Sequence, residues 1–247
     1  MKKLFAILLS IVTICSLVAC DLSGLFNGEP IEHDASKVKG NIEALAENDG
    51  IMLELAVSFE GTGEVDEATA EKIVYAQKGG LFYISNKGEE VLIDTRDAEK
   101  AYIYTKVEGE GWIRETLIYS ETDYSLEDIK ERCDQYSNAL FGYLTMYSKH
   151  ASIPMEKTSA VVAGRECDKY SFSLGVMDYS IDYSLSIDQQ TGICLEWKFS
   201  GQAGEAGSAN VAFICTAFQT PYEIEIPTDY TDRIPEIDSD KQPEVTE

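Results

Sequence analysis

The segment YSIDYSLSI (179–187) decides the fold class of this chain. Apolar residues occupy every second position in it: Tyr179, Ile181, Tyr183, Leu185 and Ile187. Because successive side chains of a β-strand point to opposite faces, this alternation predicts a strand with one apolar and one polar face. The turn-forming segment DQQTG (188–192) follows directly and predicts a hairpin. An apolar sheet face must be covered, so the segment predicts a layered protein built on a sheet.

Strand-like segments of the same kind occur on both sides and form two blocks. We expect about eleven strands, at 51–59, 68–77, 81–85, 90–95, 100–107, 112–120, 158–164, 166–174, 179–187, 193–200 and 210–218. Turn signals such as Gly79-Gly80 and Asn86-Lys87-Gly88 separate them. The connections are short, whereas parallel strands need crossovers of about a dozen residues, so the strands are expected to be antiparallel.

Two helices are predicted, one before each block of strands. The first begins at a cap, Asp34 or Ser36, and carries apolar residues at helical spacing. The second begins at the cap Ser125 and has a broad apolar stripe: Leu126, Ile129, Cys133, Tyr136, Leu140, Tyr143, Leu144 and Tyr147. The expected fold class is therefore α+β, a large curved antiparallel sheet whose concave apolar face is covered by two main helices.

The chain opens with MKKLFAILLSIVTICSLVAC (1–20), which has the parts of a secretory signal: two lysines, an apolar run and small residues at its end. Leu17-Val18-Ala19-Cys20 resembles the lipobox of bacterial lipoproteins. The resemblance implies that Cys20 becomes the mature N-terminus and carries a lipid, which places the protein at the extracytoplasmic face of the cell membrane. A transmembrane anchor and an ordinary signal peptide are the alternatives.

The remaining chain divides by composition. Residues 1–19 form the signal peptide, 20–32 a polar tether, 33–226 the folded domain and 227–247 a disordered acidic tail. The formal net charge is −24 at pH 7, which argues against nucleic-acid binding because phosphate contacts need clustered Lys and Arg. Contact with the membrane is expected through the lipid on Cys20.

The order helix, six strands, helix, five strands behind a lipobox resembles the LolA/LolB family. The segments GRECDKY (164–170) and DQQTGICLEW (188–197) also resemble stretches of lipoproteins of Gram-positive bacteria with this architecture. The resemblance implies an incomplete β-barrel with a helical lid and a concave apolar interior that takes lipid acyl chains. It carries over no catalytic residue. The expected cavity lining is Leu53, Leu55, Leu140, Leu144, Tyr183, Leu185, Leu195 and Trp197.

Signals for catalysis are missing. The two histidines, His33 and His150, lie at the edge of the tether and after the second helix, without an evident orienting partner. The chain has no nucleophile elbow, no phosphate-binding glycine motif and no closely spaced metal ligands. We therefore expect a protein that is not an enzyme, with no cofactor and no metal. The alternative to ligand binding is a structural or envelope-assembly lipoprotein with a filled barrel, acting through contacts with a protein partner that the sequence does not identify.

Four cysteines remain after the lipobox: Cys133, Cys167, Cys194 and Cys215. Strand alternation predicts Cys167 and Cys194 on the polar face with one strand between them, and Cys133 and Cys215 in the core. Two strand spacings are about 9.6 Å, beyond the limit of about 7 Å for a disulfide, but a bulge near Ser186 would close that gap. We expect a Cys167–Cys194 disulfide, with four free thiols as the alternative.

Overall fold

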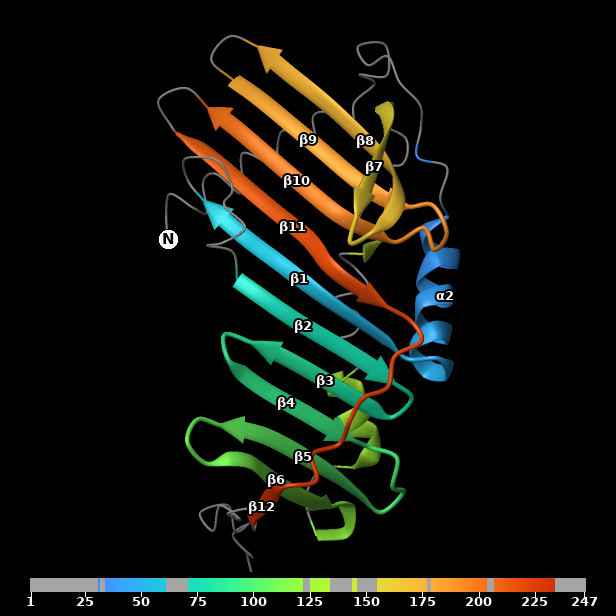
Figure 1. Cartoon of the computed structure of the whole chain (residues 1–247), viewed down its shortest axis with the longest axis vertical. Helices are drawn as coiled ribbons and strands as arrows, with labels where there is room; N and C mark the ends of the chain where they lie inside the picture. The colour runs from blue at the N-terminus through green and yellow to red at the C-terminus, as the bar shows by residue number, and fades with distance from the viewer. Residues whose placement is uncertain are drawn as a thin grey trace, which may run out of the picture.

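The structure, a computed structural model, describes residues 31, 34–60, 71–121, 125–133, 144–145, 155–176, 179–203 and 207–233. It contains one open twelve-stranded sheet, which does not close into a barrel (Figure 1). The strands are β1 (Ile51–Glu60), β2 (Glu71–Lys78), β3 (Leu81–Asn86), β4 (Glu89–Asp94), β5 (Lys100–Val107), β6 (Gly111–Ile118), β7 (Glu156–Val162), β8 (Arg165–Val176), β9 (Tyr179–Asp188), β10 (Cys194–Ala203), β11 (Ser208–Gln219) and β12 (Tyr230–Arg233). All eleven predicted strands are confirmed, and β12 is an addition.

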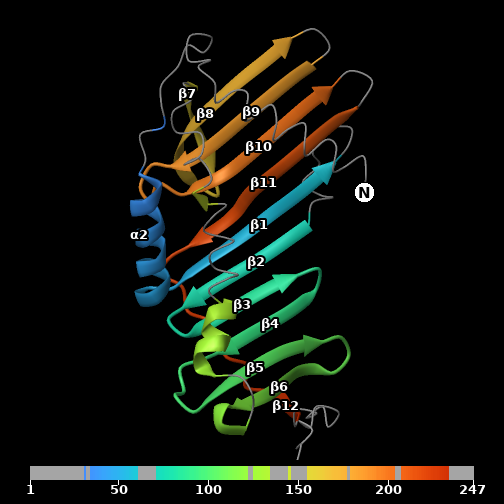
Figure 2. The same cartoon turned by 180° about the vertical axis from the view of Figure 1, so that it is seen from behind.

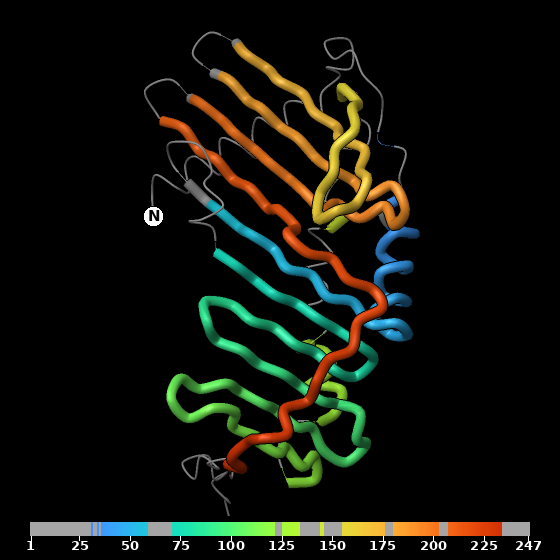
Figure 3. The backbone as a smooth tube through the Cα atoms, viewed as in Figure 1, coloured from blue at the N-terminus to red at the C-terminus, as the bar shows by residue number. Residues whose placement is uncertain are grey.

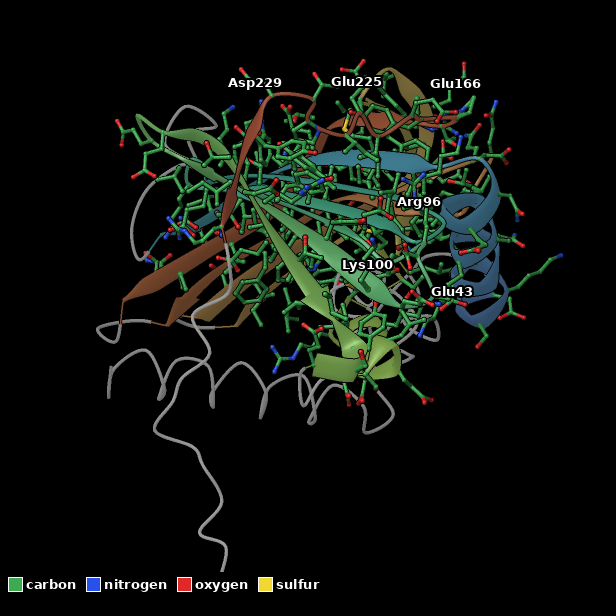
Figure 4. All side chains as sticks on the ribbon, turned by 90° about the horizontal axis from the view of Figure 1, so that it is seen from below. Glu43, Arg96, Lys100, Glu166, Glu225 and Asp229 are labelled. Carbon is green, nitrogen blue, oxygen red and sulfur yellow. The ribbon has the colours of Figure 1, made fainter. Side chains whose placement is uncertain are left out.

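Two antiparallel meanders make up the sheet. Strands β1 to β6 are neighbours in sequence order, and so are β7 to β11; the two blocks join where β1 pairs with β11. Looking along the sheet, Figure 4 shows the strand directions turning progressively, as the right-handed twist of strands requires. The two meanders therefore share one continuous sheet.

The turn between β3 and β4 shows how the sequence sets the register. Lys87 and Gly88 both have positive φ, 52° and 85°. Two such residues form the tight turn whose twist matches that of a hairpin, and Asn-Lys-Gly supplies a glycine where the left-handed backbone is needed. Val91 is consequently paired with Ile84, so that the apolar residues of both strands share a face.

Helix α2 (Ala35–Asn48) begins at Asp34, whose carboxylate accepts hydrogen bonds from the backbone N–H groups of Ser36 and Lys37. The helix lies beside one end of the strands (Figure 1). Its buried residues Val38, Ile42 and Ala46 belong to the same core cluster as Leu53 and Leu55 of β1. The first predicted helix is thus confirmed, with Asp34 as its cap.

The second predicted helix is described in part. Residues 126–133 are helical, and Ser125 caps them: its Oγ accepts from the Asp128 N–H at 3.1 Å, while the Asp128 carboxylate accepts from the Ser125 N–H at 2.7 Å. This segment lies in front of the sheet in Figure 2. The stripe residues Tyr136, Leu140, Tyr143 and Tyr147 lie outside the described residues.

A C-terminal strap, residues 222–233, crosses the other side of the sheet from β2 to β6 (Figures 1 and 3). It ends in β12, which pairs parallel to β6. In Figure 4 the exposed carboxylates of Glu225 and Asp229 lie on the outer side of this strap. The predicted domain end at residue 226 is therefore wrong, because residues beyond it complete the sheet.

The start of the predicted domain also needs correction. Ile31, which the composition places in the tether, is only 5% exposed and packs in a core cluster with Met155 and Tyr170. Cys20, the signal segment, the rest of the tether and residues 234–247 lie outside the described residues. None of the described helices has the length and apolar content needed to cross a membrane.

Candidate functional site

Strand register assigns the predicted cavity residues of the strands to one face of the sheet. Val57 of β1 is paired with Phe213 of β11, Phe213 with Trp197 of β10, and Trp197 with Leu185 of β9. Directly paired residues share a face, and residues two apart on a strand do as well. Leu53, Leu55, Tyr183, Leu185 and Trp197 therefore all point to the same side, as their alternation predicts.

On strands β8 to β11 this side carries an apolar surface, here called the aromatic face. It consists of Tyr170, Phe172, Leu174, Ile181, Tyr183, Leu185, Trp197, Phe199, Gly201, Ala209, Val211 and Phe213. No residue of the aromatic face is charged, whereas the opposite side of the same strands carries Lys169, Asp182, Glu196 and Lys198. At its border, Asp168 is ion-paired with Lys157 at 3.1 Å. In a chain with 44 acidic side chains, an uncharged area of this size is a distinct feature.

Four rings on four neighbouring strands form a continuous row across the aromatic face. The ring centroids of Phe172 and Tyr183 lie 5.3 Å apart, those of Tyr183 and Trp197 6.2 Å, and those of Trp197 and Phe213 5.5 Å. These distances are those of favourable aromatic pairs. Trp197, Phe172 and Phe213 are only partly buried, so the row combines a packed base with accessible ring surface.

The predicted cavity residues divide between two core clusters. Leu53, Leu55, Leu144 and Leu195 pack with helix α2, and each is at most 7% exposed. Tyr183 and Leu185 belong to the second cluster, with Trp197 packed against it. Leu140 lies outside the described residues. The first group therefore forms packed core beside the helix, and among the described residues of the predicted lining only Trp197 is not fully buried.

A surface groove of about 390 Å³ lies elsewhere, beside helix α2. Its lining combines the helix residues Asn41, Leu45 and Asn48 and the C-cap Asp49 with Gln190 and Thr191 of the turn after β9. None of the predicted cavity residues lines it. Sequence reasoning missed this groove because it depends on how the helix sits against a turn about 150 residues later.

At the base of that turn lies a buried ion pair. Asp188 is 1% exposed and accepts hydrogen bonds from Arg165 Nε at 2.9 Å and Arg165 Nη2 at 2.8 Å. The Thr191 N–H at 2.8 Å and the Thr191 hydroxyl donate to the same carboxylate. Burial alone would raise the pKa of Asp188, but the hydrogen bonds from Arg165 and Thr191 outweigh it, so the pKa lies below its ordinary value. These contacts fix the β9–β10 turn and the start of β8.

The cysteine predictions need correction. Cys133, Cys167, Cys194 and Cys215 are all buried and outside any disulfide, so the predicted Cys167–Cys194 disulfide is absent. A bulge between Cys194 and Glu196 breaks the expected alternation and pairs Cys194 with Ile187, and Cys167 and Cys194 pack in different core clusters. The burial of Cys133 and Cys215 is confirmed. Burial raises the pKa of Cys167 to about 11 and those of Cys194 and Cys215 to about 12, which makes the thiols poor nucleophiles.

Three aromatic residues of the first meander lie on the other side of the sheet. Tyr102, Tyr104 and Trp112 pack in a third cluster with Ile224, Ile226 and Tyr230 of the strap. Arg114 lies 4.2 Å from the Tyr230 ring centroid and pairs with Asp232 at 2.7 Å. These residues thus lie on the opposite side from the aromatic face, and the strap packs against them.

Within the described residues, no group of three or more His, Cys, Asp or Glu side chains is placed to hold a metal ion. No protein-family model matches the sequence, and no curated protein matches it.

Among solved structures, MucB matches with a TM-score of 0.30 and 14% identity over 77% of this chain and 61% of that one. PNGF-II matches with a TM-score of 0.28 and 11% identity, over 75% of this chain and 32% of that one. A DUF1329 family protein from Desulfovibrio piger matches with a TM-score of 0.27 and 11% identity, over 80% of this chain and 95% of that one. This chain thus spans about a third of PNGF-II and less than two thirds of MucB. Scores this low assign neither a family nor a function to the chain.

Proposed function

We propose that this protein is a lipid-anchored extracytoplasmic lipoprotein that binds an apolar or lipid-like ligand on its aromatic face. The lipobox-like segment ending at Cys20 supports the anchor. The observation that carries the binding function is the aromatic face itself, with its row of four rings across four strands and no charged member. Ligand sites are predominantly apolar and aromatic surfaces with few polar groups, and this face has that character.

Packing beneath the face supports the alternative function. Leu53, Leu185 and Leu195 are at most 2% exposed, so much of the predicted lining is already filled by the protein's own side chains. A structural or envelope-assembly lipoprotein with a filled interior would have such a core. The two functions differ in whether the partly buried rings of the row accept a small apolar molecule.

The two tryptophans of the chain provide the test, because Trp197 lies in the row and Trp112 packs in the strap cluster on the other side of the sheet. In the variant Trp112→Phe, Trp197 is the single tryptophan and reports on the aromatic face. We expect micromolar bromododecane, delivered from cyclodextrin, to quench its fluorescence, since bromine quenches on contact.

The matched control is Trp197→Phe, in which Trp112 is the single tryptophan and its emission should stay unchanged in the same titration. Circular dichroism verifies that both variants are folded. If Trp197 is not quenched in the folded protein, the ligand-binding function is wrong and the filled structural protein is favoured. Equal quenching of both tryptophans would mean non-specific partitioning and would also contradict binding on the aromatic face.

A further inference from the structure

The indole N–H of Trp197 is buried and has no hydrogen-bond partner within the described part of the chain. An indole nitrogen is a donor only, so only an acceptor can satisfy it. The large majority of buried side-chain polar atoms in proteins have a partner, because leaving one unpaired costs about 1–3 kcal/mol. The position therefore needs an explanation beyond packing.

The described side chains next to Trp197 offer few hydrogen-bond acceptors. Its directly paired residues are Leu185 and Phe213, and its ring contacts are Tyr183 and Phe213. Apart from the Tyr183 hydroxyl, these side chains carry no hydrogen-bonding atom. The nitrogen is buried but the ring as a whole is only partly buried, so a molecule lying on the row would contact the exposed part of the indole ring, next to the N–H.

The charges around the aromatic face indicate which ligand groups could lie next to Trp197. Among the described residues, the cationic side chain beside the aromatic face is that of Lys157, whose Nζ lies 5.6 Å from the Tyr170 ring centroid and is already paired with Asp168. Burying an unpaired charge costs far more than burying a neutral carbonyl. An ionised carboxylate or phosphate is consequently disfavoured at Trp197, whereas an uncharged carbonyl oxygen is not.

We propose that Trp197 is a specificity-determining residue. Its N–H selects uncharged apolar ligands that carry an acceptor oxygen, such as an acyl ester, over hydrocarbons of similar size; this inference rests on the proposed function. The acceptor oxygen takes the N–H hydrogen bond, while the alkyl chain lies along the rings of Phe172, Tyr183 and Phe213. The selection comes from a donor that is left unpaired when a hydrocarbon binds.

The indole N–H resonance of Trp197 provides a direct readout. The full chain contains two tryptophans and so gives two indole cross-peaks in a ¹H–¹⁵N correlation spectrum, which the variant Trp112→Phe assigns. We expect decyl acetate to shift the Trp197 indole proton downfield, because hydrogen bonding deshields it, and dodecane to cause no downfield shift. The Trp112 peak serves as the internal control and should not move with either probe.

An isosteric replacement tests the energetic contribution. Incorporation of benzothienylalanine at position 197 exchanges the N–H for sulfur and keeps the ring shape, so packing is preserved. In wild type, decyl acetate should bind about twofold to twelvefold more tightly than dodecane, the range given by one net hydrogen bond. In the replaced protein this preference should fall to about one.

The outcomes separate this proposal from the proposed function. If neither probe perturbs Trp197 and bromododecane does not quench it, ligand binding at the aromatic face is wrong. If both probes bind equally and the indole proton does not move downfield, binding stands and selection by Trp197 is overturned. A preference for decyl acetate that persists without the N–H would likewise overturn selection by Trp197.

Discussion

The ion pair between Asp188 and Arg165 should be the most sensitive polar contact of the second meander. In the substitution Asp188→Asn, one carboxylate oxygen becomes an NH₂ group. The present oxygens receive four hydrogen bonds, from Arg165 Nε, Arg165 Nη2, the Thr191 N–H and the Thr191 hydroxyl. Either orientation of the amide places its NH₂ against a donor, so at least one bond is lost and Arg165 loses its counter-charge.

The expected cost follows from burial. Removing one partner of a buried ion pair costs about 3–5 kcal/mol. The Asp188 side chain is 1% exposed but that of Arg165 is 22% exposed, so water partly compensates the arginine. We therefore expect the free energy of unfolding to fall by about 3 kcal/mol, the lower end of that range.

Urea denaturation of the full-length chain, followed by circular dichroism at neutral pH, measures this change. Asp182→Asn is the matched control, because Asp182 lies on the same strand, is exposed and accepts a hydrogen bond from the Ser173 hydroxyl at 2.6 Å. The control should cost less than about 0.5 kcal/mol, as substitutions at exposed positions usually do. A loss below about 1 kcal/mol for Asp188→Asn would refute the reasoning, since the pair would then behave like an exposed one.

The pH dependence gives an independent check. The pKa of Asp188 is lower in the folded protein than in the unfolded chain. Its contribution to stability is therefore present at pH values above the unfolded pKa and is lost as the pH falls through the folded pKa. The difference between wild type and Asp188→Asn should therefore be constant near neutral pH and shrink below about pH 4. A difference that grows on acidification would contradict a lowered pKa.

Three further results are expected. The buried thiols of Cys167, Cys194 and Cys215 should resist iodoacetamide at pH 8 in the folded protein and react in urea; rapid alkylation of the native protein would contradict their burial. Because folding raises the pKa of these thiols, the stability that they contribute is present below about pH 9 and is lost as the pH rises through their folded pKa values. Ile226→Asp should loosen the strap, lower the melting temperature and shift Trp112 emission to the red, whereas the exposed control Glu225→Gln should do neither; an unchanged Trp112 spectrum would show that the strap does not cover that side. Cys20→Ala should abolish labelling by a clickable fatty acid in the native host, and retained label would show that the lipobox interpretation is wrong.

Strand positions and faces could be predicted from the sequence because alternation is a local property. Tyr183, Leu185 and Trp197 fall on the predicted common face for that reason. The disulfide prediction was wrong because of the bulge at Cys194. This bulge depends on how β9 and β10 fit together, and no local sequence pattern predicts it.

Long-range packing accounts for the other differences. Polar and proline-rich composition predicts a disordered tail from residue 227, yet Tyr230 packs with Ile224 and Ile226 against a surface formed by strands more than a hundred residues earlier. Alternation places Leu53 and Leu195 on an apolar face and the resemblance implies a cavity there, but they lie in packed core, in one cluster with residues of helix α2. Apolar alternation predicts which side is buried and leaves open what covers it.

The position of β1 has a consequence for how the chain must mature. Strand β1 is made early, yet it lies in the middle of the finished sheet, and contacts such as that of Thr216 with Glu54 join residues 162 positions apart. Until β11 has emerged from the ribosome or the translocation machinery, the first meander exposes one edge of β1, with a row of unpaired backbone groups beside Leu55 and Val57. Closing so long a loop is slow, so the pairing of β1 with β11 should be the last part of the sheet to form. Until it forms, the nascent chain is most prone to aggregation.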